Sequence, residues 1–238
     1  MPHHGQRGQA AVESALVLPL GVFLVLGMLQ LFMMFQGRAM AQYAVARATR
    51  MGSVAHGDCE RMRHTAVAAL LPTFARTDNA VRLANAFDAR RDGRYAPGLD
   101  NNYSESIFWM TRVRPLAAEL SDLEEETFDL PGRQPRMLEV RMVFWYPLRI
   151  PFANWVIARI TLAHMQVLNF TSTNPLMLAQ ERTNWWGSGS YAPMIANELL
   201  QRTRRSHYVM PIDVSYTMRM MTPARADLFA QPSCEPFP

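Results

Sequence analysis

The residue of this sequence with the clearest chemical demand is Glu13, a carboxylate that stands just before a long apolar stretch, residues 15–35. An acid at the edge of such a stretch is costly in nonpolar surroundings unless a cation neutralises it. The residues alone leave two interpretations open. Glu13 either lies hydrated at the level of the lipid headgroups, or a cationic partner neutralises it.

The two cysteines, Cys59 and Cys234, could form a disulfide or remain as two buried thiols. An oxidising compartment such as the bacterial periplasm would permit the bridge, which would tie the end of the chain back to the region after the apolar stretch. Neither cysteine lies in a CxxC pair or near a histidine cluster with ligand spacing. The sequence therefore predicts no metal site, and we expect no cofactor.

Patterns typical of catalysis are missing from the sequence. His56 and His64 flank Cys59, but no third group or local motif supports a nucleophilic site there. No GxGxxG, Walker or GxSxG motif is present, so we do not expect an enzyme. The net charge is only +4, and arginines, the only basic side chains apart from histidine, alternate with acids. We expect no nucleic-acid partner, because no concentrated basic stripe exists.

The apolar stretch predicts a helix that spans a membrane. At about 1.5 Å rise per residue, its length matches a bilayer core of roughly 30 Å. Pro19 lies early in the stretch, and Gln30 is its only strongly polar side chain. The main alternative is a secretory signal peptide. The stretch is longer than a signal core of about 7–15 residues, follows an acid and lacks a convincing cleavage site, which favours a retained helix.

The helical pattern continues beyond the span to about residue 57, rich in alanine and free of proline. A stripe of small residues suits close packing: Ala41, Ala44, Val45 and Ala48. The arginines Arg38, Arg47 and Arg50 cluster toward one side of this extension. The extension could pack on the chain's own domain or on other subunits, and both remain open.

The segment RGQAAVESALVLPL resembles the start of a type IV prepilin. More narrowly, it resembles the TadE/TadG-like family of pseudopilins and minor pilins from Flp-type (type IVb) pilus and Tad secretion systems. A short leader ends in Gly8, a tract of small residues follows, and Val12 and Glu13 precede the apolar helix. Ser14 stands where the family usually has an aromatic residue. The close match covers about the first fifty residues.

The resemblance implies that residues 1–8 are a leader, which a prepilin peptidase removes on the cytoplasmic side to make Gln9 the new N-terminus. Glu13 would then pair with the amino group that cleavage releases on a neighbouring subunit. The implied partners are inner-membrane lipid, the prepilin peptidase, other pilin or pseudopilin subunits and the Tad assembly machinery. The implied role is assembly of a pilus or a related secretion or adhesion apparatus.

The charges flanking the span conflict with the orientation that this resemblance implies. The N-terminal side offers Arg7, whereas Arg38, Arg47 and Arg50 follow the span, so the positive-inside rule would leave the large C-terminal part in the cytoplasm. The resemblance implies a cytoplasmic N-terminus and a periplasmic domain. We adopt that orientation, because the rule is weak where a large domain follows the span.

We expect an α+β protein with a pilin-like arrangement: a long N-terminal helix over residues 9–57, then a domain over residues 58–222 with an antiparallel sheet and flanking helices, then an extended tail over residues 223–238. Strands are predicted at 81–87, 137–146, 161–170 and 208–220, and helices at 59–71, 116–126 and 194–205. Pro72 is expected to end the first of these helices, and Pro211 to place the last strand at a sheet edge. The alternative function is a single-pass, membrane-anchored periplasmic binding or sensor protein that never enters a filament.

Overall fold

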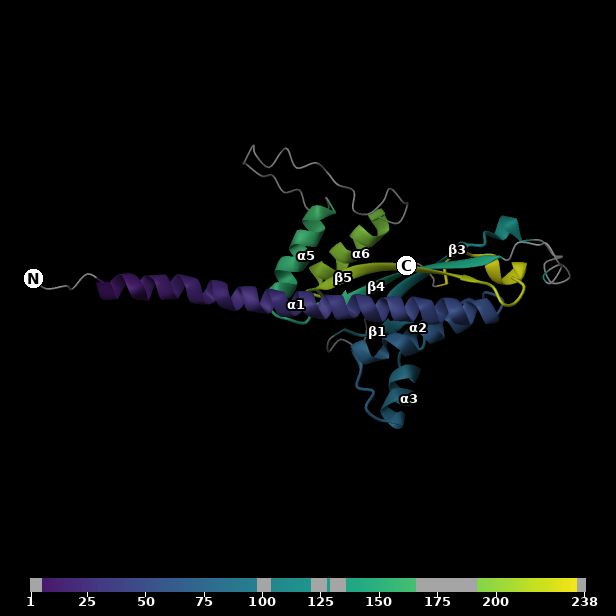
Figure 1. Ribbon diagram of the computed structural model, residues 1–238, viewed down its shortest axis with the longest axis horizontal. Helices are drawn as coiled ribbons and strands as arrows, with labels where there is room; N and C mark the ends of the chain where they lie inside the picture. Colours follow the sequence, from purple (N-terminus) through teal and green to yellow (C-terminus); the bar gives the residue numbers. More distant parts are fainter. Residues whose placement is uncertain (1–5, 98–103, 121–127, 129–135, 166–191, 235–238) are drawn as a thin grey trace, which may run out of the picture. The chain divides into compact units, whose positions relative to one another are not determined.

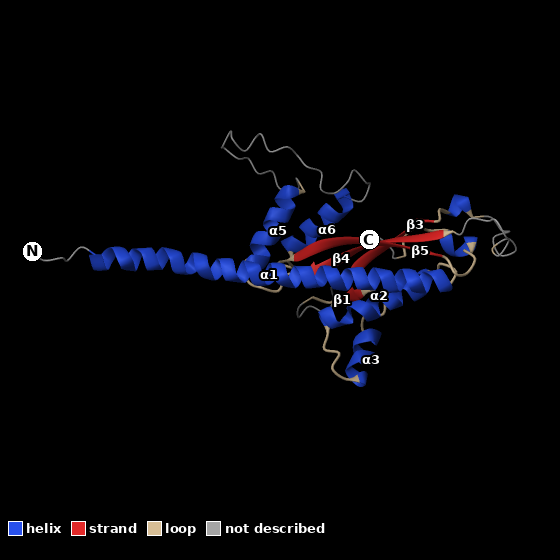
Figure 2. Ribbon diagram, in the orientation of Figure 1, coloured by secondary structure: helices blue, strands red, loops and turns tan. Residues whose placement is uncertain are grey.

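The computed structural model describes residues 6–97, 104–120, 128, 136–165 and 192–234. The fold class is α+β, as predicted: a long N-terminal helix precedes a part with antiparallel sheets and flanking helices (Figures 1 and 2). The chain divides into two compact units. One unit comprises Met1–Phe35 with Pro147–Met210, and the other comprises Gln36–Tyr146 with Pro211–Pro238.

The N-terminal helix α1, Gln6–Val54, is continuous through Pro19. Proline is tolerated there because it removes a single backbone hydrogen bond, which neighbouring groups can replace in an apolar setting. Within the described residues, Glu13–Val54 is the one helical stretch long and apolar enough to cross a membrane by length and composition. Few residues in its most apolar part are buried within the protein. The predicted apolar helix is therefore present, and most of its side chains are exposed, whereas Gln30 is buried.

The second half of α1 packs against its own unit. The stripe formed by Ala41, Ala44, Val45 and Ala48 has no exposed surface, which resolves the alternatives left open by the sequence in favour of intramolecular packing. A glycine, Gly52, permits a close approach, because an added Cβ would lie 2.5 Å from Met62 Sδ and 2.8 Å from Leu138 Cδ2. Gly37 faces the ring of Tyr146 in the same way.

Two shorter helices follow α1. Helix α2 spans Cys59–Phe74 and begins with the Asp58 side chain accepting a hydrogen bond from the Glu60 N–H at 2.9 Å. The prediction that Pro72 ends this helix is wrong, because the helix continues to Phe74. Helix α3, Ala80–Asp88, replaces the strand predicted at residues 81–87.

The main sheet has three strands in the order β3-β4-β5, with β4 in the centre. Their bounds are Phe108–Arg114, Met137–Pro147 and Val209–Arg219. The predicted strands at 137–146 and 208–220 are confirmed, and Pro211 lies on an edge strand as expected. Strands β3 and β4 are antiparallel and bring apolar residues together, for example Phe108 opposite Phe144. A second, two-stranded sheet pairs β1, Arg94–Tyr95, with β2, Glu105–Ser106.

Residues 232–234 lie along the outer edge of β3. Ser233 forms an isolated antiparallel bridge with Thr111, and the Cys234 N–H donates to the Met110 carbonyl at 2.9 Å. The tail was expected to be extended throughout, but Ala226–Phe229 forms the 3-10 helix η3. A 3-10 turn, η1 at Ala117–Glu119, stands in the region predicted as an acidic helix, of which residues 121–127 lie outside the described residues.

Among its described residues, the unit that contains the start of α1 also holds helices α5 at Ala153–His164 and α6 at Ala192–Arg204. The helix predicted at 194–205 is confirmed by α6. The strand predicted at 161–170 is wrong where it is described, because residues 161–164 belong to α5. Arg202 of α6 is fully buried, and its Nε donates to Glu198 Oε1 at 2.7 Å.

Candidate functional site

The residues singled out at the start of the chain all lie on α1. Because α1 begins at Gln6, the predicted cleavage residues Gly8 and Gln9 belong to its first turn. Glu13 follows one turn later and is exposed. No ionic partner for Glu13 is found within the described residues. Within the part of the chain that the structure describes, this carboxylate is therefore left for a cation from elsewhere, such as a neighbouring molecule.

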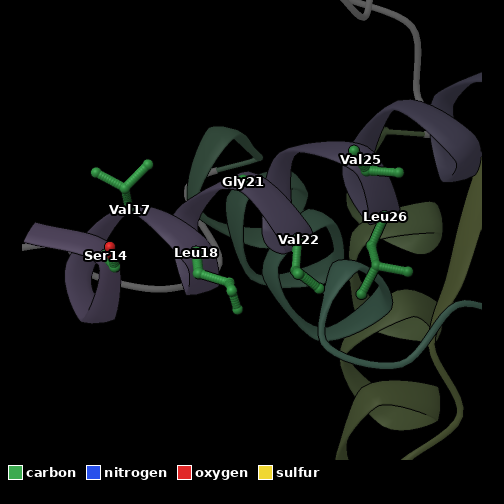
Figure 3. Close-up of a pocket in the computed structure, with 7 residues that line it drawn as sticks. All are labelled: Ser14, Val17, Leu18, Gly21, Val22, Val25 and Leu26. Carbon is green, nitrogen blue, oxygen red and sulfur yellow. The ribbon is translucent and has the colours of Figure 1, made fainter. Parts of the chain in front are cut away.

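A shallow groove follows Glu13 on one side of α1 (Figure 3). All its lining residues come from this one helix: Ser14, Val17, Leu18, Gly21, Val22, Val25 and Leu26. Gly21 lies at its centre, where an added Cβ would meet no other atom within 4 Å. Small residues on a lipid-facing helix allow a second helix to approach closely, so the groove suits helix packing.

The groove continues as a stripe with the spacing of a heptad repeat. The stripe consists of Ser14, Leu18, Gly21, Val25, Met28, Phe32 and Phe35. Its large members remain exposed, from 55% at Val25 to 73% at Phe35. Alternating steps of four and three residues keep these side chains on one seam, which is the pattern by which helices associate side by side.

Gln30 lies on the opposite side of this part of α1 and is fully buried. Its Oε1 accepts a hydrogen bond of 2.9 Å from the backbone N–H of Ile150, just before α5. Both residues belong to the same unit. The polar side chain in the apolar stretch thus has a structural role: it pairs a backbone donor that would otherwise be unsatisfied in a water-poor environment.

The structure joins Cys59 to Cys234 by a disulfide, with the Cα atoms 4.9 Å apart. Arg112 of β3 reinforces this connection. Its Nη1 donates to the Gly57 carbonyl at 2.7 Å, and its Nη2 donates to the Gln231 carbonyl. The guanidinium also lies 4.2 Å from the centre of the Phe229 ring.

The geometry around Gly57 explains its residue type. Gly57 has a φ of 84° and the Phe229 ring lies against its Cα, so neither the backbone conformation nor the space would suit a side chain.

Burial lowers the pKa of Arg112 to about 10, against the opposing effect of the Asp58 carboxylate. Arg112 therefore remains cationic at neutral pH and keeps its hydrogen bonds to the Gly57 and Gln231 carbonyls.

The described residues contain no group of three or more His, Cys, Asp or Glu side chains that could hold a metal ion. Cys59 is disulfide-bonded, which removes it as a free nucleophile beside His56 and His64. The features that this structure offers for function are surfaces for packing: the seam on α1 and an exposed face on α5. Sequence reasoning missed the face on α5, although Trp155 and the apolar residues around it were visible in the sequence.

Comparison with known proteins agrees with the character of α1. Residues 8–50 match the family model described as TadE-like protein. No curated protein and no solved structure matches the chain. The match begins at Gly8, includes Glu13 and the whole apolar stretch, and ends within α1. Residues 8–50 are therefore similar to TadE-like proteins, and this match together with the long apolar helix supports membrane anchoring.

Proposed function

We propose that this chain is a TadE-like minor pilin or pseudopilin, processed after Gly8, whose N-terminal helix takes part in assembly of a Flp-type (type IVb) pilus or a related secretion or adhesion apparatus. The observation that carries the proposal is the coincidence of the TadE-like match with the exposed seam on α1. A helix that served only as an anchor would need length and hydrophobicity, but no groove centred on a glycine.

Cleavage between Gly8 and Gln9 would create a positively charged amino group four residues before Glu13. In an apolar bundle, that amino group on one subunit can neutralise Glu13 of the next. A carboxylate left unpaired within a membrane costs about 3 kcal/mol on insertion scales at the bilayer centre, and less toward the interface. This cost makes the pairing selective, because helices in the wrong register would leave the acid without a partner.

The disulfide supports the proposed orientation. Disulfides persist in oxidising compartments, and among bacterial compartments the periplasm is one. Cys59 and Cys234 both follow the apolar stretch, so a bond between them is consistent with a C-terminal part in the periplasm and an N-terminus in the cytoplasm, where the peptidase acts. The arginines after the span favour the reverse orientation. We give the disulfide more weight, because the bond persists only in an oxidising compartment, whereas flanking arginines only bias the direction in which a span is inserted.

Processing is the first test. In cells that contain the prepilin peptidase, the intact mass of the purified chain should correspond to a protein that begins at Gln9. Replacing Gly8 with a bulky residue should leave the leader in place. A chain that retains residues 1–8 in such cells would refute processing and favour the alternative of a solitary anchored binding or sensor protein.

Incorporation is the second test. Glu13→Gln keeps the shape of the side chain but removes its charge, so it should permit membrane insertion and leader removal while reducing recovery of the chain with sheared filaments or with cross-linked assembly partners. Gln36→Ala, at an exposed position beyond the apolar stretch, is the matched control and should behave as the wild type does. Equal recovery of Glu13→Gln and the wild type would contradict the pairing.

A further inference from the structure

The segment that leads into α5 is attached to α1 within the apolar stretch. The hydrogen bond between Gln30 Oε1 and the Ile150 N–H fixes the point of attachment. Gln30 lies five residues before Phe35, the end of the apolar stretch, which corresponds to about 7.5 Å along a helix. If α1 crosses a membrane, Ile150 lies at that depth, below the boundary where α1 leaves the apolar layer.

The backbone of this segment is suited to such a depth, because few of its polar groups need water. Pro147 and Pro151 have no N–H group at all. Neighbouring N–H groups donate within the same unit: Leu148 to the Tyr208 carbonyl, Asn154 to the Ile150 carbonyl and Val156 to the Phe152 carbonyl. Backbone donors that are paired internally can enter a low-dielectric region without the penalty of unsatisfied groups.

The outer face of α5 carries large apolar side chains that are exposed. Phe152, just before the helix, is 73% exposed, and Trp155 and Ile160 are 50% and 63% exposed. Arg159 stands over the Trp155 ring, with its guanidinium carbon 5.7 Å from the ring centre. Tryptophan concentrates at the level of lipid headgroups, and an arginine beside it can extend its cationic end toward phosphate while its stem lies on apolar surface. This combination is typical of a helix that lies at a membrane surface.

We propose that this face of α5 lies in the interfacial layer of the membrane that α1 crosses, with Phe152, Trp155 and Ile160 among the acyl chains and Arg159 at the phospholipid phosphates. The proposal rests on α1 spanning the membrane. Figure 1 shows α5 running away from α1 rather than alongside it, as a helix lying in the plane of the membrane must do. Interfacial helices bury their apolar face about 5–10 Å below the headgroup boundary, which matches the depth set by Gln30.

The function of this contact between α5 and lipid is to hold the N-terminal part of α1 at a fixed depth in the membrane. A single spanning helix can slide and rotate in lipid at little cost, because hydrophobic mismatch costs only fractions of a kcal/mol per ångström. A second helix that lies in the interface opposes both movements. The seam on α1 would then be presented to neighbouring subunits at a constant depth. The exposed face of α5 would be covered by lipid rather than by a protein.

The test uses the full chain in vesicles of phosphatidylcholine and phosphatidylglycerol. The phosphatidylcholine carries bromine, a quencher of tryptophan fluorescence, either near the headgroup end of its acyl chains or near their terminal methyl groups. The emission of Trp155 is obtained as the difference between the wild type and Trp155→Phe. We expect this difference to be quenched strongly by the shallow bromines and weakly by the deep ones. Trp109→Phe, which removes a buried tryptophan instead, should give a difference that neither bromine position quenches.

A tryptophan placed in the span separates failure of this proposal from failure of membrane anchoring. Phe32→Trp in the Trp155→Phe background should be quenched by lipid bromines, because Phe32 is exposed within the apolar stretch. If Phe32→Trp is quenched and the Trp155 emission is not, α5 does not lie in the interface. If the Trp155 emission is instead protected from both the bromines and aqueous iodide, protein rather than lipid covers this face, which also overturns the proposal. If neither tryptophan is quenched, the chain is not inserted and the proposal fails with the anchoring.

Discussion

Removing the disulfide should destabilise the protein strongly while leaving its folded structure in place. The bond closes a loop with a sequence separation of 175 residues. In the loop-entropy account, a loop of that length is worth about 5 kcal/mol, because the cross-link restricts the unfolded chain. Measured values are usually lower than this account gives, so we expect Cys59→Ser/Cys234→Ser to lose about 2–5 kcal/mol of unfolding free energy.

The folded tail should remain docked in that variant because other contacts hold it. Arg112 Nη1 still donates to the Gly57 carbonyl at 2.7 Å, and the Arg112 N–H still donates to the Pro232 carbonyl at 2.8 Å. The Cys234 N–H still donates to the Met110 carbonyl. Each such bond contributes about 1 kcal/mol net, enough together to keep the tail ordered in the native state.

The assay is urea unfolding of the full chain in detergent micelles, followed by tryptophan fluorescence, to which the buried Trp145 contributes. A reductant should lower the midpoint of the wild type and leave that of the double variant unchanged. A loss below about 1 kcal/mol would refute the reasoning, since the cross-link would then hardly restrict the unfolded state. Loss of the native near-ultraviolet circular dichroism in the variant without urea would show instead that the tail contacts depend on the bond.

Three further substitutions test the packing. Gly52→Leu should cost about 1–3 kcal/mol or more, because its side chain would overlap Met62, whereas Gly27→Leu meets no atom at Cβ and should be near neutral in the same urea assay; equal effects would contradict the close approach. Gln30→Leu leaves the Ile150 N–H unpaired, so it should cost about 1–3 kcal/mol and increase amide exchange there; unchanged exchange would discount the bond. Arg141→Ala removes a partly exposed ion pair with Asp213 on β5 and should lower the unfolding free energy by about 1 kcal/mol or less at low salt. This loss should shrink at high salt, and a loss that does not depend on salt would point to packing instead.

The elements that could be predicted from the sequence are those with one buried face. Strand β4 alternates Leu138, Val140 and Met142 with polar residues, and these three side chains are fully buried. The α1 helix was evident from its length and hydrophobicity. Strand β3 was missed because Phe108, Trp109, Met110 and Thr111 are buried one after another, so they show no alternation of apolar and polar residues.

The two wrong strands have a different cause. Residues 81–87 and 161–164 contain residues that favour strands, such as Val81, Phe87 and Thr161, and intrinsic preference was given too much weight. The decisive information lay outside these segments. Asn79 caps α3 by accepting from the Arg82 N–H at 2.8 Å, and the predicted strand at 161 began in the last turn of a helix that starts at Ala153.

At the candidate site, residue type and position could be predicted but partners could not. The sequence identified Glu13 as an acid in an apolar setting and Gln30 as the polar residue of the span. It could not indicate that Gln30 bonds to Ile150, because that contact joins residues 120 positions apart. Likewise, the sequence left open whether Cys59 and Cys234 form a disulfide or remain free thiols, until the fold brought them together.

The position of residues 232–234 beside β3 has a consequence for how copies of this protein can associate. An unpaired edge strand is a template for strand exchange between molecules, which some fimbriae use to polymerise. Here the bridge between Thr111 and Ser233 occupies the outer side of β3 with the protein's own backbone. A foreign strand cannot add there without first displacing a covalently fastened segment, so polymerisation by donor strands is blocked at that edge.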